Sequence, residues 1–257
     1  MEWPANADAI QNLLLIFARM GGLVMTAPVF SSHRVPPQLR VAISVIMTLI
    51  VFPLVRPMPI ENSIINFGFL ILNEVIIGLV LGFTANMIFM VIQVAGEMQD
   101  TQIGFGFAGV VDANMGHSSA IVGQLQMIMM WIIFVAANGH HFLLRAVTES
   151  FILIPPGLGA FQVAGVNRMV AISAEMLMLA VKIGAPVVAA VLVADMSMGV
   201  LQRTAPQLNL MAVGFQVKIA VGVIVLILAM PMIVGMQYDL VSYMARIVNE
   251  MMVFFKP

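Results

Sequence analysis

Gly104 to Gly109 match the spacing G-x-G-x-x-G, which in other proteins cradles the pyrophosphate of a dinucleotide. That fingerprint needs a preceding strand and an acid about 20 residues further on, and here Met129 stands at that distance from Gly109. Cofactor binding is therefore not expected. Glycines permit sharp turns and Phe105 and Phe107 supply bulk, which suits a loop that folds back to obstruct a cavity. A plain connecting loop is the open alternative.

His140 and His141 are the next residues that could do chemistry. Neighbouring residues on a helix point about 100° apart, so this pair cannot chelate a metal as two histidines four residues apart do. A capping or interfacial role is the favoured interpretation. The chain has no cysteine, which removes thiolate sites and disulfides, and no nucleophile elbow, H-E-x-x-H or phosphate loop. We expect neither an enzyme nor a metal or cofactor site.

Four ionisable residues stand inside apolar runs, namely Arg19, Glu74, Lys182 and Asp195. Such residues usually face a bundle interior or a wet cavity. Glu175 and Lys182 are seven residues apart and share a helix face, so both could point inward. A proton or ion relay is one interpretation. Because the four are scattered, pairing with neighbouring subunits is the favoured one.

The composition indicates what must surround this chain. It is 61% hydrophobic and 9% charged, and its mean hydropathy is +1.06. Average soluble domains are about 45–50% apolar and about 25% charged, so membrane lipid or a large assembly must cover the surface. The net charge of −1 gives no indication of a nucleic-acid partner. The first cation, Arg19, lies inside the first apolar run, so we do not expect a cleaved signal peptide.

A membrane-spanning helix needs about 20 mostly apolar residues. Six runs predict about six long helices and an all-α, membrane-associated fold: 10–30, 39–55, 66–95, 120–137, 170–200 and 210–235. Pro186 and Pro231 favour kinks within their runs. The glycine-rich stretch 96–119 is predicted to be a long loop, and 202–209 a tight turn between the last two helices.

Two further patterns concern packing. Gly78-x-x-x-Gly82 permits close approach of two helices. The chain also contains 24 methionines, whose side chains are flexible and polarizable. They are interpreted either as lipid-facing filler or as a compliant lining for something variable in shape.

Several short motifs together resemble the FliR family of flagellar export proteins. They are Pro28-Val29-Phe30 with Arg34, Pro36, Pro37 and Arg40; Glu74 to Phe83; Gly96 with the loop Gln99 to Gly109; Asn138-Gly139-His140 with Pro155; and Ala185-Pro186-Val187-Val188 with Asp195, Gly199 and Arg203 to Asn209. Each motif is weak alone, and their order makes the resemblance specific. The injectisome counterparts of FliR share the fold and the motifs.

The resemblance implies a core subunit of the type III protein export gate in the bacterial inner membrane, at the flagellar basal body. FliR-like chains assemble with FliP and FliQ into a closed helical cone that conducts unfolded export substrates, with FlhB and FlhA as further partners. Residues 1–165 would be the FliP-like part and 166–257 a FliQ-like hairpin, forming helical hairpins within a hetero-oligomeric cone.

The resemblance also implies roles for particular residues. The structural turn of the hairpin would contain Arg203, Pro206, Gln207 and Asn209. The loop after the third apolar run would plug the closed pore, which maps onto Gly104, Phe105, Gly106, Phe107, Gly109, Asp112 and His117. An injectisome gate subunit, a small-solute secondary transporter and a lipid-embedded scaffold without a conduit remain the alternatives.

Overall fold

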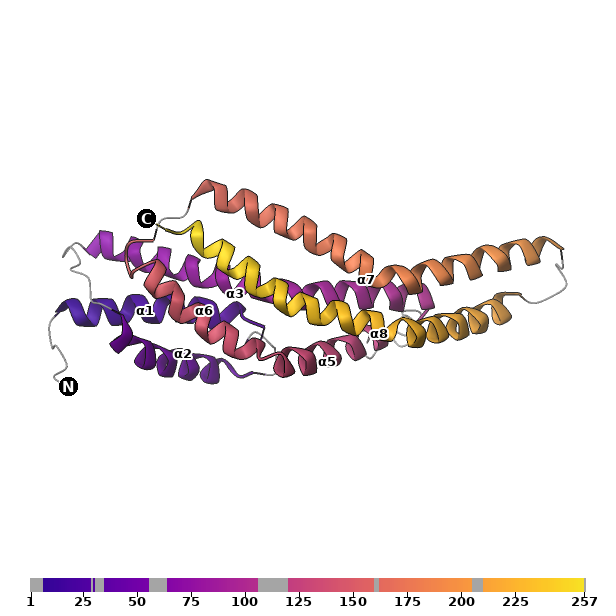
Figure 1. Ribbon diagram of the computed structural model, residues 1–257, viewed down its shortest axis with the longest axis horizontal. Helices are drawn as coiled ribbons and strands as arrows, with labels where there is room; N and C mark the ends of the chain where they lie inside the picture. The colour runs from indigo at the N-terminus through magenta and orange to yellow at the C-terminus, as the bar shows by residue number, and fades with distance from the viewer. Residues whose placement is uncertain are drawn as a thin grey trace. The chain divides into compact units, whose positions relative to one another are not determined.

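The computed structural model describes residues 7–28, 30, 35–55, 64–105, 120–159, 162–204 and 210–256. All regular structure in these ranges is helical, and they contain no strand (Figure 1). This confirms the all-α prediction. Packing divides the chain into two compact units. Unit 1 consists of Met1–Ile88, Asn138–Ser173 and Ser242–Pro257, and unit 2 of Phe89–Ala137 and Ala174–Val241. The division at residue 165 stays a prediction.

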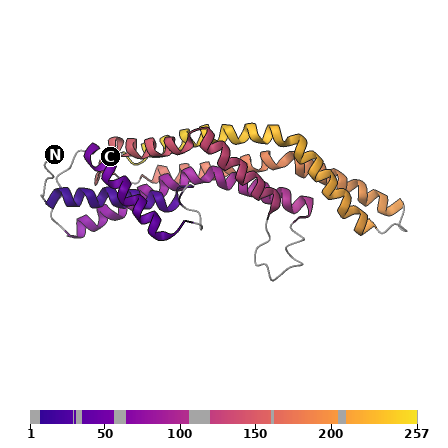
Figure 2. The same ribbon diagram turned by 90° about the horizontal axis from the view of Figure 1, so that it is seen from below.

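Unit 1 contains three complete α-helices: α1 (Ala7–Thr26), α2 (Pro37–Val51) and α6 (Gly139–Leu153). Helix α2 lies alongside α1 (Figures 1 and 2). Pro37 at its first position fits a helix start, because proline lacks only an N–H that would have no partner there. The helix ends in a short 3-10 turn, η1 (Phe52–Leu54), which contains Pro53.

Unit 2 contains α5 (Ile121–Ala136) together with parts of the three longest helices. These are α3 (Ile64–Ile103), α7 (Val163–Thr204) and α8 (Leu210–Val253), which have 40, 42 and 44 residues and contribute to both units. Within unit 2, α7 and α8 run side by side (Figures 1 and 2). Pro186 and Pro231 lie inside α7 and α8 respectively.

One predicted boundary is wrong, and one helix was not predicted. The predicted loop 96–119 begins too early, because α3 continues to Ile103 and Gly96 is a buried helical residue. The sequence also did not predict α6, whose His140, His141, Arg145 and Glu149 interrupt the apolar pattern. Asn138, with φ of +56°, lies between α5 and α6. Among the described residues, five helices are long and apolar enough to cross a membrane, or six if α5 and α6 together form one broken span.

Small residues bring α1 and α3 into backbone contact in unit 1. A Cβ atom on Gly22 would lie 2.6 Å from the carbonyl oxygen of Val75. One on Gly78 would overlap the carbonyl oxygen of Arg19, and one on Gly82 would lie 2.6 Å from that of Leu23. These neighbours are backbone atoms and cannot turn aside. The prediction that Gly78 and Gly82 permit close helix packing is confirmed.

We expect Gly78→Ala to destabilise unit 1 by about 1–3 kcal/mol, because the added methyl group must push α1 away from α3. Heat-induced aggregation of the full chain in solubilised native membranes measures the effect. Gly68→Ala in the same helix is the matched control, since its Cβ would meet nothing within 4 Å. Equal melting behaviour of the two variants would contradict the close packing.

Candidate functional site

The most deeply buried charges lie in unit 1. Arg19 on α1 is 1% exposed and Glu74 on α3 is 0% exposed. The guanidinium donates from Nε to Glu74 Oε2 at 2.5 Å and from Nη2 to Glu74 Oε1 at 3.1 Å. This bidentate contact fixes the orientation of both side chains. Buried charges of this kind persist only when they are paired.

The other groups around this pair come from α6 and the residues after it. Arg19 Nη1 donates to the carbonyl oxygen of Ser150 at 3.0 Å, and the guanidinium lies 4.3 Å from the ring centroid of Phe151. Glu74 Oε1 accepts from the backbone N–H of Gly157 at 2.9 Å. One ion pair therefore ties α1, α3, α6 and the turn after α6 together, and we call these groups the Arg19 network.

The structure corrects the expected partners of the intramembrane charges. Arg19 and Glu74 pair with each other inside the chain instead of with neighbouring subunits. Asp195 on α7 likewise bonds Lys218 on α8 at 2.9 Å, and these side chains are 42% and 24% exposed. Lys182 is exposed on α7, so it does not face the interior of this chain, and its pairing with a neighbouring subunit stays a prediction.

In unit 2 a buried carboxylate caps α5. Asp100 on α3 is 2% exposed, and its Oδ1 and Oδ2 accept from the backbone N–H groups of Val122 at 2.9 Å and Gly123 at 2.8 Å. These N–H groups belong to the first helical turn, which has no intrahelical acceptors for them and carries positive partial charge. Gly123 also packs against Gly96 so closely that a Cβ on Gly96 would overlap the Gly123 Cα. Asp100 thus fixes the start of α5 on the end of α3.

Three fully buried glutamines lie in the same unit, and we call them the glutamine cluster: Gln99 on α3, Gln126 on α5 and Gln237 on α8. Gln126 Nε2 donates to Gln99 Oε1, and Gln99 Nε2 donates to the carbonyl oxygen of Ile183 on α7 at 3.3 Å. Gln237 Nε2 donates to the backbone carbonyl of Gln126 at 3.3 Å. The cluster therefore links all four helices of unit 2.

The predicted plug residues fall mostly outside the described residues. Gly104, with φ of +101°, follows the end of α3, and a Cβ there would lie 2.9 Å from the Phe215 ring. Phe105 is half-buried. Gly106, Phe107, Gly109, Asp112 and His117 lie outside the described ranges, as do Pro206, Gln207 and Asn209 of the predicted turn. Arg203 is exposed in the last turn of α7.

His140 and His141 stack on each other, with ring centroids 4.2 Å apart. His141 is exposed and His140 is half-buried at the first turn of α6. In the part of the chain that the structure describes, no three histidine, aspartate or glutamate residues gather closely enough to hold a metal ion.

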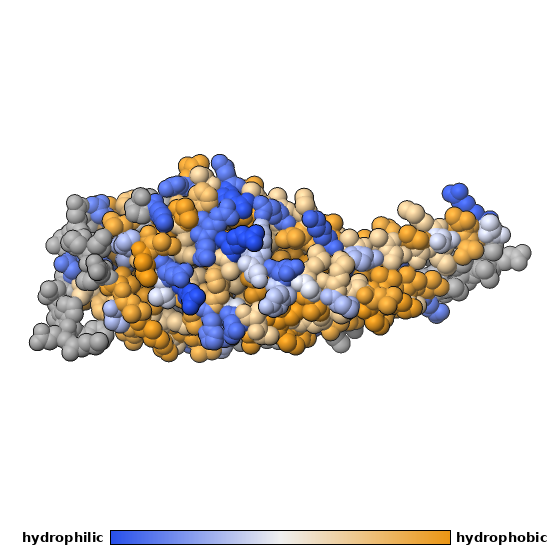
Figure 3. Space-filling view, viewed as in Figure 1, coloured by the Kyte–Doolittle hydropathy of each residue, from blue (hydrophilic) through white to orange (hydrophobic). Residues whose placement is uncertain are grey.

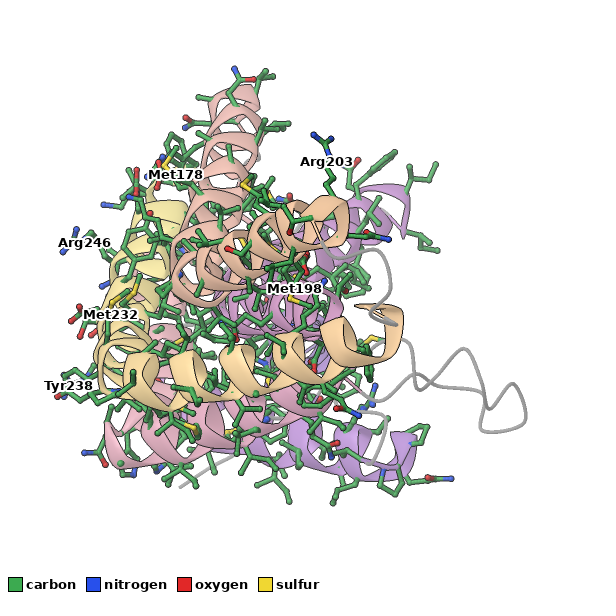
Figure 4. All side chains as sticks on the ribbon, turned by 90° about the vertical axis from the view of Figure 1, so that its right-hand side faces the viewer. Met178, Met198, Arg203, Met232, Tyr238 and Arg246 are labelled. Carbon is green, nitrogen blue, oxygen red and sulfur yellow. The ribbon has the colours of Figure 1, made fainter. Side chains whose placement is uncertain are left out.

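A broad apolar surface covers α7 and α8 in unit 2 (Figure 3). We call it the hairpin surface, and its exposed members include Val193, Met196 and Val200 on α7 and Ile224, Ile227 and Leu228 on α8. Met178, Met232 and Tyr238 also lie on the outer side of these helices (Figure 4), at 60%, 49% and 57% exposure. Such an apolar surface needs lipid or protein to cover it.

Sequence reasoning missed the groups that position this unit. Gln99 and Asp100 were interpreted as part of a loop, and Gln126 and Gln237 were not singled out, although each of the four is a polar residue within or beside an apolar run. Gln126 stands between Leu125 and Met127, for example. A search for polar residues isolated in apolar runs, extended from charged to amide side chains, finds them.

We predict that Arg19→Leu destabilises the chain by about 3–5 kcal/mol, because it leaves Glu74 buried and unpaired. The double change Arg19→Leu with Glu74→Leu removes both charges and should recover most of that loss. Arg168→Leu is the control, since Arg168 and Glu250 are 26% and 38% exposed and such a pair contributes about 0.2–1 kcal/mol. Thermal unfolding of Arg19→Leu, Glu74→Leu and the double variant measures these losses. A loss in the double variant equal to the sum of the two single losses would contradict the coupling of Arg19 with Glu74.

The chain matches the family model described as bacterial export proteins, family 1, over residues 10–255. It is 33% identical over 230 residues to the flagellar biosynthetic protein FliR of Bacillus subtilis (strain 168), covering 88% of each chain. It is 26% identical to that of Aquifex aeolicus (strain VF5), covering 91% of this chain and 90% of the relative. For FliR of Escherichia coli (strain K12) the identity is 25%, with 84% and 82% covered. This chain therefore belongs to the FliR family of flagellar biosynthetic export proteins.

Proposed function

We propose that this membrane protein is a core subunit of the flagellar type III protein export gate. In this proposal it lies in the bacterial inner membrane at the flagellar basal body and forms with FliP and FliQ a closed conduit for unfolded export substrates. FlhB and FlhA are the proposed neighbours of that assembly. Membership of the FliR family supports the role in flagellar export.

The observation that supports the proposed assembly is that α8 is much longer than the hydrocarbon core of a bilayer is thick. Helix α8 has 44 residues, so at about 1.5 Å per residue it is about 66 Å long. The hydrocarbon core of a bilayer is about 30 Å thick. A straight helix of that length would need a tilt of more than about 60° to stay inside, whereas membrane helices tilt by about 0–40°. Helix α8 therefore extends beyond the hydrocarbon core, and we infer that protein covers part of its apolar surface.

The burial of the long helices supports the same conclusion. In the most apolar 18-residue window of α3, 61% of the residues are buried within the chain, but in that of α8 only 17% are. Helix α3 is thus an interior helix of this chain, while α8 presents its apolar side chains outward. Other subunits with apolar helices are the partners that such a surface fits.

Expressed alone and extracted in detergent, the chain should be aggregated or heterogeneous, because the hairpin surface has no partner. Co-expressed with FliP and FliQ, it should elute with both as one monodisperse particle. Size-exclusion chromatography with light scattering measures both states. A monodisperse monomer that unfolds cooperatively without FliP or FliQ would overturn the proposal.

We further propose that the segment from Gly104 to His117 closes the conduit. Support comes from the family resemblance and from the two bulky rings among the glycines at Phe105 and Phe107. Burying each ring contributes roughly 1.5–3 kcal/mol. Two rings therefore bias the segment toward closure by a few kcal/mol, which holds the open state at about 1% or below.

Deleting residues 105–110 should raise the leakage of ions and small solutes across the membrane without preventing assembly. Phe105→Ala and Phe107→Ala should each leak less than the deletion, since one ring remains. Membrane conductance of cells that express the assembled gate measures both. Wild-type conductance in a normally assembled deletion variant would show that the segment is only a connection.

A further inference from the structure

The buried apolar side chains of the long helices in unit 2 recur at regular spacing. On α7 the fully buried residues are Ala180, Ile183, Val187 and Val191, which are 0–1% exposed and recur with every turn. On α8 the buried aliphatic residues Leu226, Ile233 and Leu240 recur every seven residues, which is about two turns. If α7 slid by one turn or α8 by two, aliphatic side chains would again meet aliphatic side chains. Apolar contacts alone therefore discriminate poorly between neighbouring registers.

The glutamine cluster lacks this repeat. Gln99, Gln126 and Gln237 are each 0% exposed, and their amide groups bond across the interfaces between α3, α5, α7 and α8. Hydrogen bonds have short range and defined direction, so a shift of one turn breaks them. A buried amide that loses its partner pays the full cost of desolvation.

One bond of the cluster lies beside the proline in α7. Pro186 has no N–H, so the carbonyl of Lys182, four residues earlier, lacks its usual partner within the helix. Gln99 Nε2 donates to the carbonyl of the next residue, Ile183. This hydrogen bond joins the end of α3 to the turn of α7 that precedes its proline.

We propose that the glutamine cluster is a register lock, which selects one axial alignment of α3, α5, α7 and α8 among several that the apolar surfaces permit. This role goes beyond export itself and does not depend on the identity of the partner subunits. Each unpaired buried amide should disfavour a shifted register roughly 5- to 150-fold. A single buried asparagine plays the same part in coiled coils.

Cysteine cross-linking tests the lock directly, because the chain contains no cysteine of its own. A Cβ on Gly222 would lie 2.6 Å from Ile103 Cγ1, so the pair Ile103→Cys with Gly222→Cys reports the observed register. Ile103→Cys with Ala229→Cys, or with Met230→Cys, reports a slide of α8 by about two turns. Disulfides need Cα atoms within about 7 Å, and two turns of helix rise by about 11 Å, so these shifted pairs should not form in the observed alignment.

In native membranes the full chain should cross-link through the first pair alone. With Gln126→Met and Gln237→Met added, one of the shifted pairs should gain at least about tenfold in yield after oxidation. The melting temperature of the Met variants should stay equal or rise, because methionine fills the same volume without a polar group. A role in core stability alone would lower the melting temperature and leave the cross-linking pattern unchanged.

The matched controls are Gln124→Met on α5 and Gln216→Met on α8, which replace exposed glutamines on the same two helices. They should leave the cross-linking pattern as it is in the unmodified chain. If the double Met variant does not accumulate, Gln237→Asn keeps an amide that is too short to reach the Gln126 carbonyl, and it should also raise the yield of a shifted pair. Cross-linking through the first pair alone in every accumulated variant would overturn the lock.

Discussion

Helices α3, α7 and α8 have 40, 42 and 44 residues, so each is about twice as long as the hydrocarbon core of a bilayer is thick. Neither lipid alone nor water alone can solvate such helices along their whole length. Helix α3 is covered mainly by this chain, whereas α8 is left largely uncovered within it. This constraint explains why the chain combines an apolar composition with a surface that has so few charges. It is also the observation from which we propose protein partners.

Within so apolar an interior, a few polar groups determine the arrangement of the helices. In unit 1 the Arg19 network joins α1, α3 and α6, and glycines let α1 and α3 approach to backbone contact. In unit 2 Asp100 and the glutamine cluster do the same for α3, α5, α7 and α8. Apolar burial supplies most of the stabilisation, but it is non-directional. The buried hydrogen bonds are directional, so they determine how the helices are aligned.

The sequence was informative wherever one helix could be judged by itself. Apolar runs located most helices, and Gly78 with Gly82 indicated a close contact that α1 provides. It was uninformative about pairing, because the partner of Arg19 lies 55 residues away and only the fold brings it near. Gly96 was interpreted as the start of a loop, but its lack of a side chain serves packing against Gly123. Helix α6 was missed because its polar residues suit a short helix that packs beside a buried ion pair.

Site-specific photo-cross-linking along α8 tests most directly whether protein covers the hairpin surface. A benzophenone side chain at Ile224, Ile227 or Leu228, which are 57%, 64% and 75% exposed, samples whatever lies within a few ångströms of each position. In membranes of cells with an intact flagellar gate, these positions should form adducts with FliP or FliQ. Adducts with lipid alone at all three positions would contradict the account.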